Sequence, residues 1–319
     1  MFVDLIFVIL GIVVLVKSAD FLVDSSSNLA VKLGVSAVVV GAIVVGFGTS
    51  MPEMAVSTTA AVKGDINLGI GNVVGSIIAN LTLVLGATAF TASIPLPKHF
   101  LKFHIPLSIN ATIWFFVFIQ NGLRRYEGIV LLGMLILSLA LMIREGKRDI
   151  ARNVDLRQKP PESTTLLKTK SRVPGSVVIL LSLIGVIGSS YFITEGSIGL
   201  AKEWGIESGF VGASLIAVGT SLPELVASVV ALRKGKTEMI IGTILGSNVF
   251  NGVAIGAAMG ILGPGGTSGT RISGWVSIIS VTAALVLWIW KSLSDTPIGK
   301  MLGAFLLGIY ALWLLLVAL

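Results

Sequence analysis

The sequence contains no cysteine and few charged residues. Without cysteine, the chain can form neither disulfides nor thiolate metal sites, and it has no thiol nucleophile. Charged residues make up 12% of the chain, whereas about 25% is usual in soluble domains. The two histidines, His99 and His104, are predicted to lie near a membrane edge. These absences argue against a soluble domain and against a site for soft metal ions.

Apolar residues are abundant instead, and they form long blocks. Hydrophobic residues make up 54% of the 319 residues, and many apolar runs reach the ~20 residues that a helix needs to cross a bilayer. A transmembrane β-barrel would show ~10-residue alternating segments instead. We therefore expect an all-α polytopic membrane protein with ten transmembrane helices. The predicted spans are residues 2–22, 36–62, 67–91, 101–120, 126–143, 175–198, 207–232, 238–262, 273–290 and 299–318.

The positive charges are distributed unevenly between the loops. A net charge of +7 and a pI near 9.7 would suggest nucleic-acid binding in a soluble protein, but basic loops of membrane proteins stay in the cytoplasm. If the basic segment 144–174 is cytoplasmic, the inside loops carry eighteen of the 23 lysines and arginines. This pattern predicts a plasma-membrane protein with both termini outside. The expected partner is the lipid bilayer, with neither nucleic acid nor a protein partner.

Two parts of the chain are similar to each other. Gly41–Ser57 reads GAIVVGFGTSMPEMAVS and aligns with Gly212–Ser228, GASLIAVGTSLPELVAS, at an offset of 171 residues. The same offset, without a gap, aligns Gly71–Asn80 with Gly242–Asn251. Two polar blocks at one offset indicate an internal duplication rather than a chance match of apolar sequence.

Each copy contains five predicted spans. Because this number is odd, the second copy has the opposite orientation in the membrane. We expect two inverted five-helix repeats, with a basic cytoplasmic linker between them. Inverted repeats place a shared site near the bilayer midplane, where interrupted helices meet. The predicted boundaries are 1–143 for the first repeat, with its motif at 41–86, 144–174 for the linker, and 175–319 for the second repeat, with its motif at 212–256.

Glu53 and Glu224 are the deepest ionisable residues of the predicted spans. A carboxylate at the bilayer centre costs at least ~2.5–3.5 kcal/mol, and two carboxylates in one pocket repel each other. A bound cation neutralises both, so the symmetric pair predicts a buried cation site; structural glutamates bonded to backbone are the alternative. Asp20, Asp24 and Glu195 lie near span ends and are expected to face water.

The residues before each glutamate predict a break in the helix and a supply of oxygen atoms. A proline directly precedes each glutamate, and a glycine lies five positions before it. Proline removes a helical N–H and frees carbonyls, and irregular backbone at membrane depth is tolerated where it lines a cavity. A hydroxyl in a membrane helix can also simply bond to its own helix. The candidate ligands are the carbonyls near Gly46 and Ala217 and the hydroxyls of Thr49, Ser50, Thr220 and Ser221.

The second aligned block adds Ser76 and Asn80 in one copy, and Ser247 and Asn251 in the other. Residues four apart lie on one helix face; an asparagine there is either a ligand or an interhelical hydrogen bonder. Carboxylate, amide and hydroxyl oxygens together form the ligand set that hard cations prefer, and Ca²⁺ takes six to eight oxygens. Two carboxylates balance one Ca²⁺, two Na⁺ or two protons, so competition for one site would couple their exchange.

At these residues the sequence resembles the cation/calcium antiporter superfamily, and more closely its sodium/calcium exchanger family, which includes prokaryotic calcium/sodium antiporters. GTSMPE and GTSLPE are similar to the cores of that family's two repeats. The resemblance implies an antiporter, not an enzyme, that exchanges Ca²⁺ for Na⁺ by alternating access and needs no cofactor. It implies that Glu53 and Glu224 are the chief Ca²⁺ ligands, and that the neighbouring hydroxyls and carbonyls bind Ca²⁺ or Na⁺.

The sequence departs from the family at one point. Many sodium/calcium exchangers have an aspartate at one of the positions that match Asn80 and Asn251, and here both are asparagine. The site then has one less potential negative charge, which leaves room for an H⁺/Ca²⁺ exchanger that uses the same glutamates as proton carriers. A cation channel and an intramembrane hydrolase with paired carboxylates are alternatives from other classes. Channels, however, usually line their pores with rings of acids from several subunits.

Overall fold

The structure is a computed structural model that describes residues 2–95, 102–120, 122–155, 174–203, 217–265, 275–294 and 296–318. This part of the chain is helical apart from turns and one isolated bridge between Ile94 and Ile298. The helices are α1 (Phe2–Leu33), α2 (Ala37–Val40), α3 (Phe47–Thr49), α4 (Met51–Val62), α5 (Ile66–Ala79), α6 (Leu85–Thr91), α8 (His104–Ile119), α9 (Arg125–Asp155), α10 (Gly175–Glu203), α12 (Ala217–Arg233), α13 (Thr237–Val249), α14 (Gly256–Leu262), α15 (Trp275–Leu293) and α16 (Lys300–Ala318). In this part of the chain three π-helical segments lie between them, η1 (Gly41–Gly46), η2 (Asn80–Val84) and η5 (Phe250–Ile255).

Several helices are long and apolar enough to cross a membrane. Among the described residues five meet this requirement alone, and a sixth span results if the bent pair from Ala37 to Val62 counts as one. Three shorter apolar helices accompany them in the described residues, within α8, α15 and α16. The all-helical, multi-pass membrane class predicted from composition is therefore confirmed.

Two helices continue beyond the ends of their predicted spans. The first predicted span ends at residue 22, but α1 continues to Leu33; the fifth predicted span ends at residue 143, but α9 continues to Asp155. Both extensions are polar, so hydropathy does not detect them. In α9 an ion pair between Arg148 and Glu145, 3.5 Å apart, supports the extra turns. The first part of the predicted linker is thus helical.

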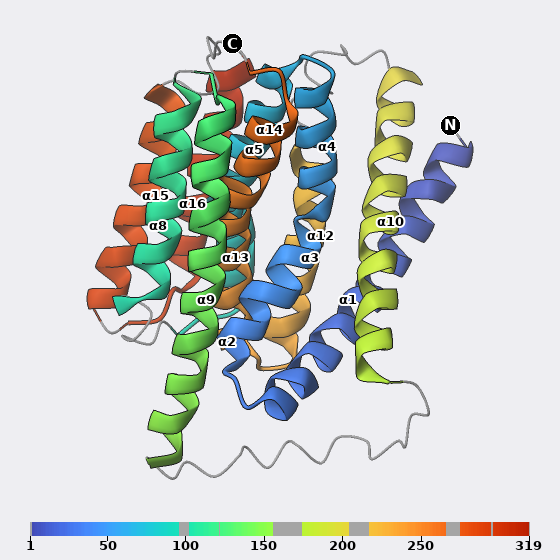
Figure 1. The fold of residues 1–319 in the computed structure, drawn as a ribbon. Helices are drawn as coiled ribbons and strands as arrows, with labels where there is room; N and C mark the ends of the chain where they lie inside the picture. Colours follow the sequence, from blue (N-terminus) through green and yellow to red (C-terminus); the bar gives the residue numbers. More distant parts are fainter. Residues whose placement is uncertain are drawn as a thin grey trace.

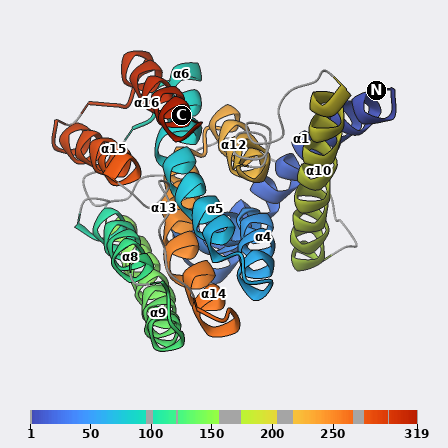
Figure 2. The ribbon, with the colours of Figure 1, turned by 90° about the horizontal axis from the view of Figure 1, so that it is seen from above.

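The helices form a central group with a separate pair at one side. Figure 2 shows α5 and α13 in the middle and the α1–α10 pair at the edge. The α13–α14 span is fully buried over its most apolar window. Close packing at the centre depends on glycine: a Cβ on Gly46 would lie 2.9 Å from the carbonyl oxygen of Thr243.

The predicted helix breaks at the two prolines have different outcomes. In the first half the helix bends by 48° at Ser50, just before Pro52. In the second half α12 continues through Pro223, so the predicted break at that proline is wrong. Residues 212–216 of the second motif lie outside the described residues.

Hydrogen bonding accounts for this difference. Pro223 cannot donate to the carbonyl of Gly219, but the Ser190 hydroxyl of α10 donates to it at 2.7 Å, and such a side-chain bond lets a membrane helix continue past a proline. The residue 171 positions before Ser190 is Ala19, which has no hydroxyl. In the first half the carbonyl of Gly48 accepts instead a backbone N–H at the end of α3.

Candidate cation site

Glu53 and Glu224 are fully buried in the central group of helices. Glu53 lies in the first turn of α4, directly after the bend, and Glu224 follows Pro223 in α12. Both side chains are 0% exposed, and Ser50, three residues before Glu53, donates a hydrogen bond to Glu224. Two buried carboxylates from segments far apart in the sequence thus meet in one place.

In each glutamate the oxygen Oε1 accepts a hydroxyl hydrogen bond. Ser76 Oγ donates to Glu53 Oε1 at 3.2 Å, and Ser50 Oγ donates to Glu224 Oε1 at 2.9 Å. The other oxygen of each carboxylate, Oε2, is buried without a hydrogen-bond partner. The Ser50 bond joins the two halves of the chain, because its donor belongs to the first motif and its acceptor to the second.

Asn80 and Asn251 are buried in π-helical segments. Asn80 opens η2 and Asn251 lies in η5; π-helical turns occur frequently at functional sites. Asn251 Nδ2 donates to Ser76 Oγ at 2.8 Å, whereas Asn80 Nδ2 donates to Asn248 Oδ1 at 3.1 Å. In both residues the amide NH₂ is used and the carbonyl oxygen Oδ1 has no partner.

Some of the remaining predicted ligands are already hydrogen-bonded within the protein, and one is without a partner. Thr49 Oγ1 donates to the carbonyls of Val45 and Gly46 in its own helix, at 2.9 and 3.3 Å, and Ser247 Oγ donates to the Gly46 carbonyl at 3.0 Å. The Gly46 carbonyl is therefore already hydrogen-bonded. Ser221 Oγ has no partner.

The other two predicted residues belong to α12. Thr220 is buried one turn before Glu224. Ala217 is the first residue of that helix, and only its backbone lies within the described part.

Two further asparagines support the site, and neither is among the ligands predicted from the sequence. Asn248 is fully buried and binds Asn80. Asn72 donates through Nδ2 to the backbone carbonyl of Glu53 at 3.3 Å and to Ser57 Oγ at 2.9 Å. A signal for Asn248 was present: the residue 171 positions before it is Ile77, so an amide stands where the other copy has an aliphatic side chain.

The buried oxygens without partners define what the site can bind. An unsatisfied buried polar group costs about 1–3 kcal/mol, and a hard cation would offset that cost at several oxygens simultaneously. No group of three or more His, Cys, Asp or Glu side chains occurs in the described residues, so amide and hydroxyl oxygens must complete any such site. The acceptors are Glu53 Oε2, Glu224 Oε2, Asn80 Oδ1, Asn251 Oδ1 and Ser221 Oγ.

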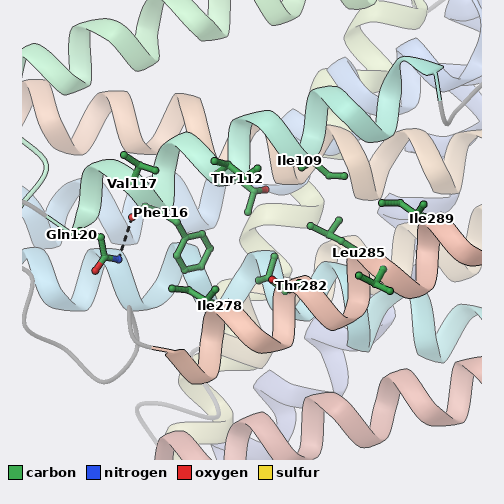
Figure 3. Close-up of a pocket in the computed structure, with 12 residues that line it drawn as sticks. Ile109, Thr112, Phe116, Val117, Gln120, Ile278, Thr282, Leu285 and Ile289 are labelled. Carbon is green, nitrogen blue, oxygen red and sulfur yellow. Dashed lines mark hydrogen bonds between the residues drawn. The ribbon is translucent and has the colours of Figure 1, made fainter.

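An open groove between α8 and α15 has a different chemistry. Apolar side chains such as Phe116 and Leu285 line it (Figure 3). Two of its polar side chains bond to their own helix: Thr112 Oγ1 donates to the carbonyl of Ser108, and Gln120 Nε2 donates to that of Phe116. The groove contains no acidic residue and is not a cation site.

Comparison with known proteins gives one consistent result. The profile of the family described as "Sodium/calcium exchanger protein" matches residues 3–144 and 175–319. CaxA of Alkalimonas amylolytica is 34% identical over 295 residues, which are 90% of this chain and 89% of that protein. The sodium/calcium exchanger MaX1 of Methanosarcina acetivorans is 32% identical over 281 residues, covering 78% of this chain and 80% of MaX1. A structure of the sodium-calcium exchanger NCX_Mj, soaked with Na⁺, has a TM-score of 0.81 at 27% identity and covers 98% of this chain and 97% of its own.

Proposed function

This chain belongs to the sodium/calcium exchanger family, and from that premise we propose that it is a secondary active antiporter that exchanges Ca²⁺ for Na⁺. The two ions compete for one site at Glu53 and Glu224, and alternating access carries them across the bilayer. The observation that supports this most is the pair of fully buried carboxylates, each with one oxygen hydrogen-bonded and the other without a partner.

The ligand set follows from the chemistry of the surrounding atoms. Glu53 and Glu224 supply charge, while Asn80 and Asn251 supply amide oxygens, since their NH₂ groups already donate elsewhere. The other members of the proposed set are the hydroxyls of Ser50, Ser76, Ser221, Ser247, Thr49 and Thr220 and the carbonyls of Gly46 and Ala217. Ca²⁺ and Na⁺ are the cargo, and the transport step requires no resident cofactor.

The proposed architecture is two inverted five-helix repeats, at residues 1–143 and 175–319, with a cytoplasmic segment at 144–174. Matching element boundaries support it: α5 begins at Ile66 and α13 at Thr237, and α6 and α14 also begin 171 residues apart. The first helices of the two halves also run in opposite directions in Figure 1. Ten spans with both termini outside the plasma membrane complete this proposal.

A neutral site explains how the exchange is coupled. Two carboxylates without a cation repel each other in a medium of low dielectric constant, so the empty site is unfavourable. One Ca²⁺ or two Na⁺ restores neutrality, and α1 and α10 can then move past the central helices. Because Asn80 and Asn251 add no negative charge, two protons would balance the glutamates equally well. Protons are thus the second candidate counter-ion.

The test is radioactive Ca²⁺ uptake into liposomes that contain the purified protein. An outward Na⁺ gradient is compared with an outward proton gradient at fixed membrane potential. Uptake driven by Na⁺ alone supports the proposal, and uptake driven by protons alone replaces it with H⁺/Ca²⁺ exchange. Unitary conductance in a planar bilayer would instead identify a channel.

A further inference from the structure

An ion-pair cluster joins α1 to the turn between α12 and α13. Lys234 Nζ lies 2.8 Å from Asp20 Oδ1 and 2.6 Å from Asp24 Oδ2, and Lys236 Nζ lies 2.8 Å from Asp24 Oδ1. Lys234 also donates to the backbone carbonyl of Asp20 at 3.1 Å. The two aspartates are four residues apart on one face of α1. We call these four residues the inner latch, because the proposed topology places them on the cytoplasmic side.

The cluster is built more firmly than an isolated surface pair. The lysine side chains are 22% exposed, half as much as the aspartates they contact. Burial lowers the pKa of Lys234, but hydrogen bonds to Asp20 and Asp24 outweigh this effect and raise it, so the ammonium stays charged. A single exposed ion pair contributes about 0–1 kcal/mol, and networks contribute more.

The inner latch connects parts of the molecule with different packing. α1 packs mainly against α10, and the two form the pair at the edge of Figure 2. The turn with the lysines, in contrast, joins the helix of Glu224 to the helix of Asn248. A movement of α1 past the inner end of α12 must therefore break these ion pairs.

The offset of 171 residues predicts a counterpart on the opposite side. Asp24 corresponds to Glu195 on α10, and Lys234 corresponds to Lys63 at the end of α4. Both counterparts are exposed, and within the described residues neither forms an ion pair. Figure 1 shows the ends of α4 and α10 opposite the end that carries the inner latch.

The corresponding positions on the opposite side also carry fewer groups that can form ion pairs. Asp20 corresponds to Tyr191, and Lys236 corresponds to Asp65. Asp65 accepts a hydrogen bond from the backbone N–H of Leu68 at 3.1 Å and so caps α5. With Asp65 in that role, the four corresponding positions offer one pair of opposite charges, Lys63 and Glu195. We call these two residues the outer latch.

We propose that the inner and outer latches close in turn during transport, the inner one while the site is accessible from outside and the outer one while it is accessible from inside. This inference rests on the proposed antiport. Three ion-pair contacts oppose one, so the protein without bound cations favours the state with the inner latch closed. The latches are positioning groups that set this equilibrium and do not touch the cations.

The absence of cysteine gives a direct test. Ser228 is buried one turn beyond Glu224 towards the inner end of α12, and Ser57 is its counterpart on α4. Ser228→Cys or Ser57→Cys provides a single thiol, whose labelling by a membrane-impermeant maleimide is measured from one side of the bilayer. The readout is the labelling rate, so it does not require transport.

We expect Asp24→Asn to speed labelling of Ser228→Cys from the inner side by about 3–10-fold, the change that the loss of a network of this size gives. Glu195→Gln should not speed it. Lys236→Gln should add nothing in the Asp24→Asn background, because Lys236 acts through Asp24. Glu238→Gln removes an exposed charge four residues from Lys234 and is the control; it should leave the rate unchanged.

The outcomes separate the latch from the antiport. An unchanged rate in Asp24→Asn, or an equal rise in Glu238→Gln, overturns the latch even if Na⁺-driven Ca²⁺ uptake is normal. If the unmodified protein does not take up Ca²⁺, the proposed antiport is wrong. The labelling rates do not depend on transport, and they still show whether the ion pairs limit access to the thiol at position 228. Elution as a single peak in detergent shows that each variant is folded. If Asp24→Asn fails this check, Lys234→Gln takes its place with the same expected rise.

Discussion

In the first half of the molecule the helix that carries Glu53 bends by 48° at Ser50, whereas in the second half α12 carries Glu224 through Pro223 without a break. Their hydrogen bonds also differ. Glu53 is bound by Ser76, from the helix that follows it in the same half, but Glu224 is bound by Ser50 from the opposite half. Ser221, the counterpart of Ser50, binds nothing.

The two asparagines extend this contrast. Asn251 binds Ser76, which in turn binds Glu53, so one chain of hydrogen bonds reaches the carboxylate. Asn80 would match this by binding Ser247, but it binds Asn248. Nearly identical motifs thus give unequal surroundings to the two glutamates. A duplicated sequence fixes which side chains are present, while the packing of the halves decides their partners.

The largest effect is expected when either carboxylate is removed. Glu53→Gln and Glu224→Gln should each reduce Na⁺-driven Ca²⁺ uptake more than about 100-fold, since leaving one buried charge unpaired costs about 3–5 kcal/mol. Equal losses would show that both halves are needed despite their different hydrogen bonds. Near-normal uptake by either variant would contradict the proposed site.

The next effect concerns the asymmetric amide. Asn248→Ile copies Ile77 and removes the acceptor for Asn80 Nδ2, so Asn80 Oδ1 loses its fixed direction. The apparent Ca²⁺ affinity should fall about 10-fold, which corresponds to ~1.4 kcal/mol. If Asn248 acts through Asn80, the change should disappear in an Asn80→Ala background. An additive double variant would instead indicate a separate structural role.

A smaller effect is expected from added charge. Asn251→Asp places a carboxylate where this chain has an amide, and the Na⁺ dependence or stoichiometry of uptake should change because a third charge then needs a counter-ion. Asn80→Asp is the matched variant in the other half. If Asn251→Asp and the unmodified protein give the same Na⁺ titration, Asn251 does not belong to the ligand set.

The smallest effect tests why only one helix bends. Ser190→Ala leaves the Gly219 carbonyl without its donor and should lower the free energy of unfolding by about 1–3 kcal/mol, seen as a lower midpoint of thermal unfolding in detergent. Ser189→Ala is the control, since that hydroxyl bonds only to its own helix. Equal midpoints for the two variants would argue against this account of Pro223.

Much of this protein could be predicted from periodicity and duplication. The apolar blocks gave the helical membrane class, and the aligned motifs identified Glu53 and Glu224, which the fold brings together. The predictions were less accurate where polar groups find distant partners. The extension of α1 to Leu33 is an example. Asp20 and Asp24, close to the predicted end of the first span, pair with Lys234, which lies more than 200 residues away in the sequence.

By itself, the sequence determined the membrane class, the family and the identity of the two buried acids, because hydropathy and a repeated motif are properties of the chain alone. Only the tertiary structure decided which helix bends, which asparagine binds Asn248 and which lysines pair with Asp20 and Asp24. Those outcomes depend on hydrogen bonds between segments far apart in the chain. A buried donor or acceptor takes whichever partner the packing brings within reach.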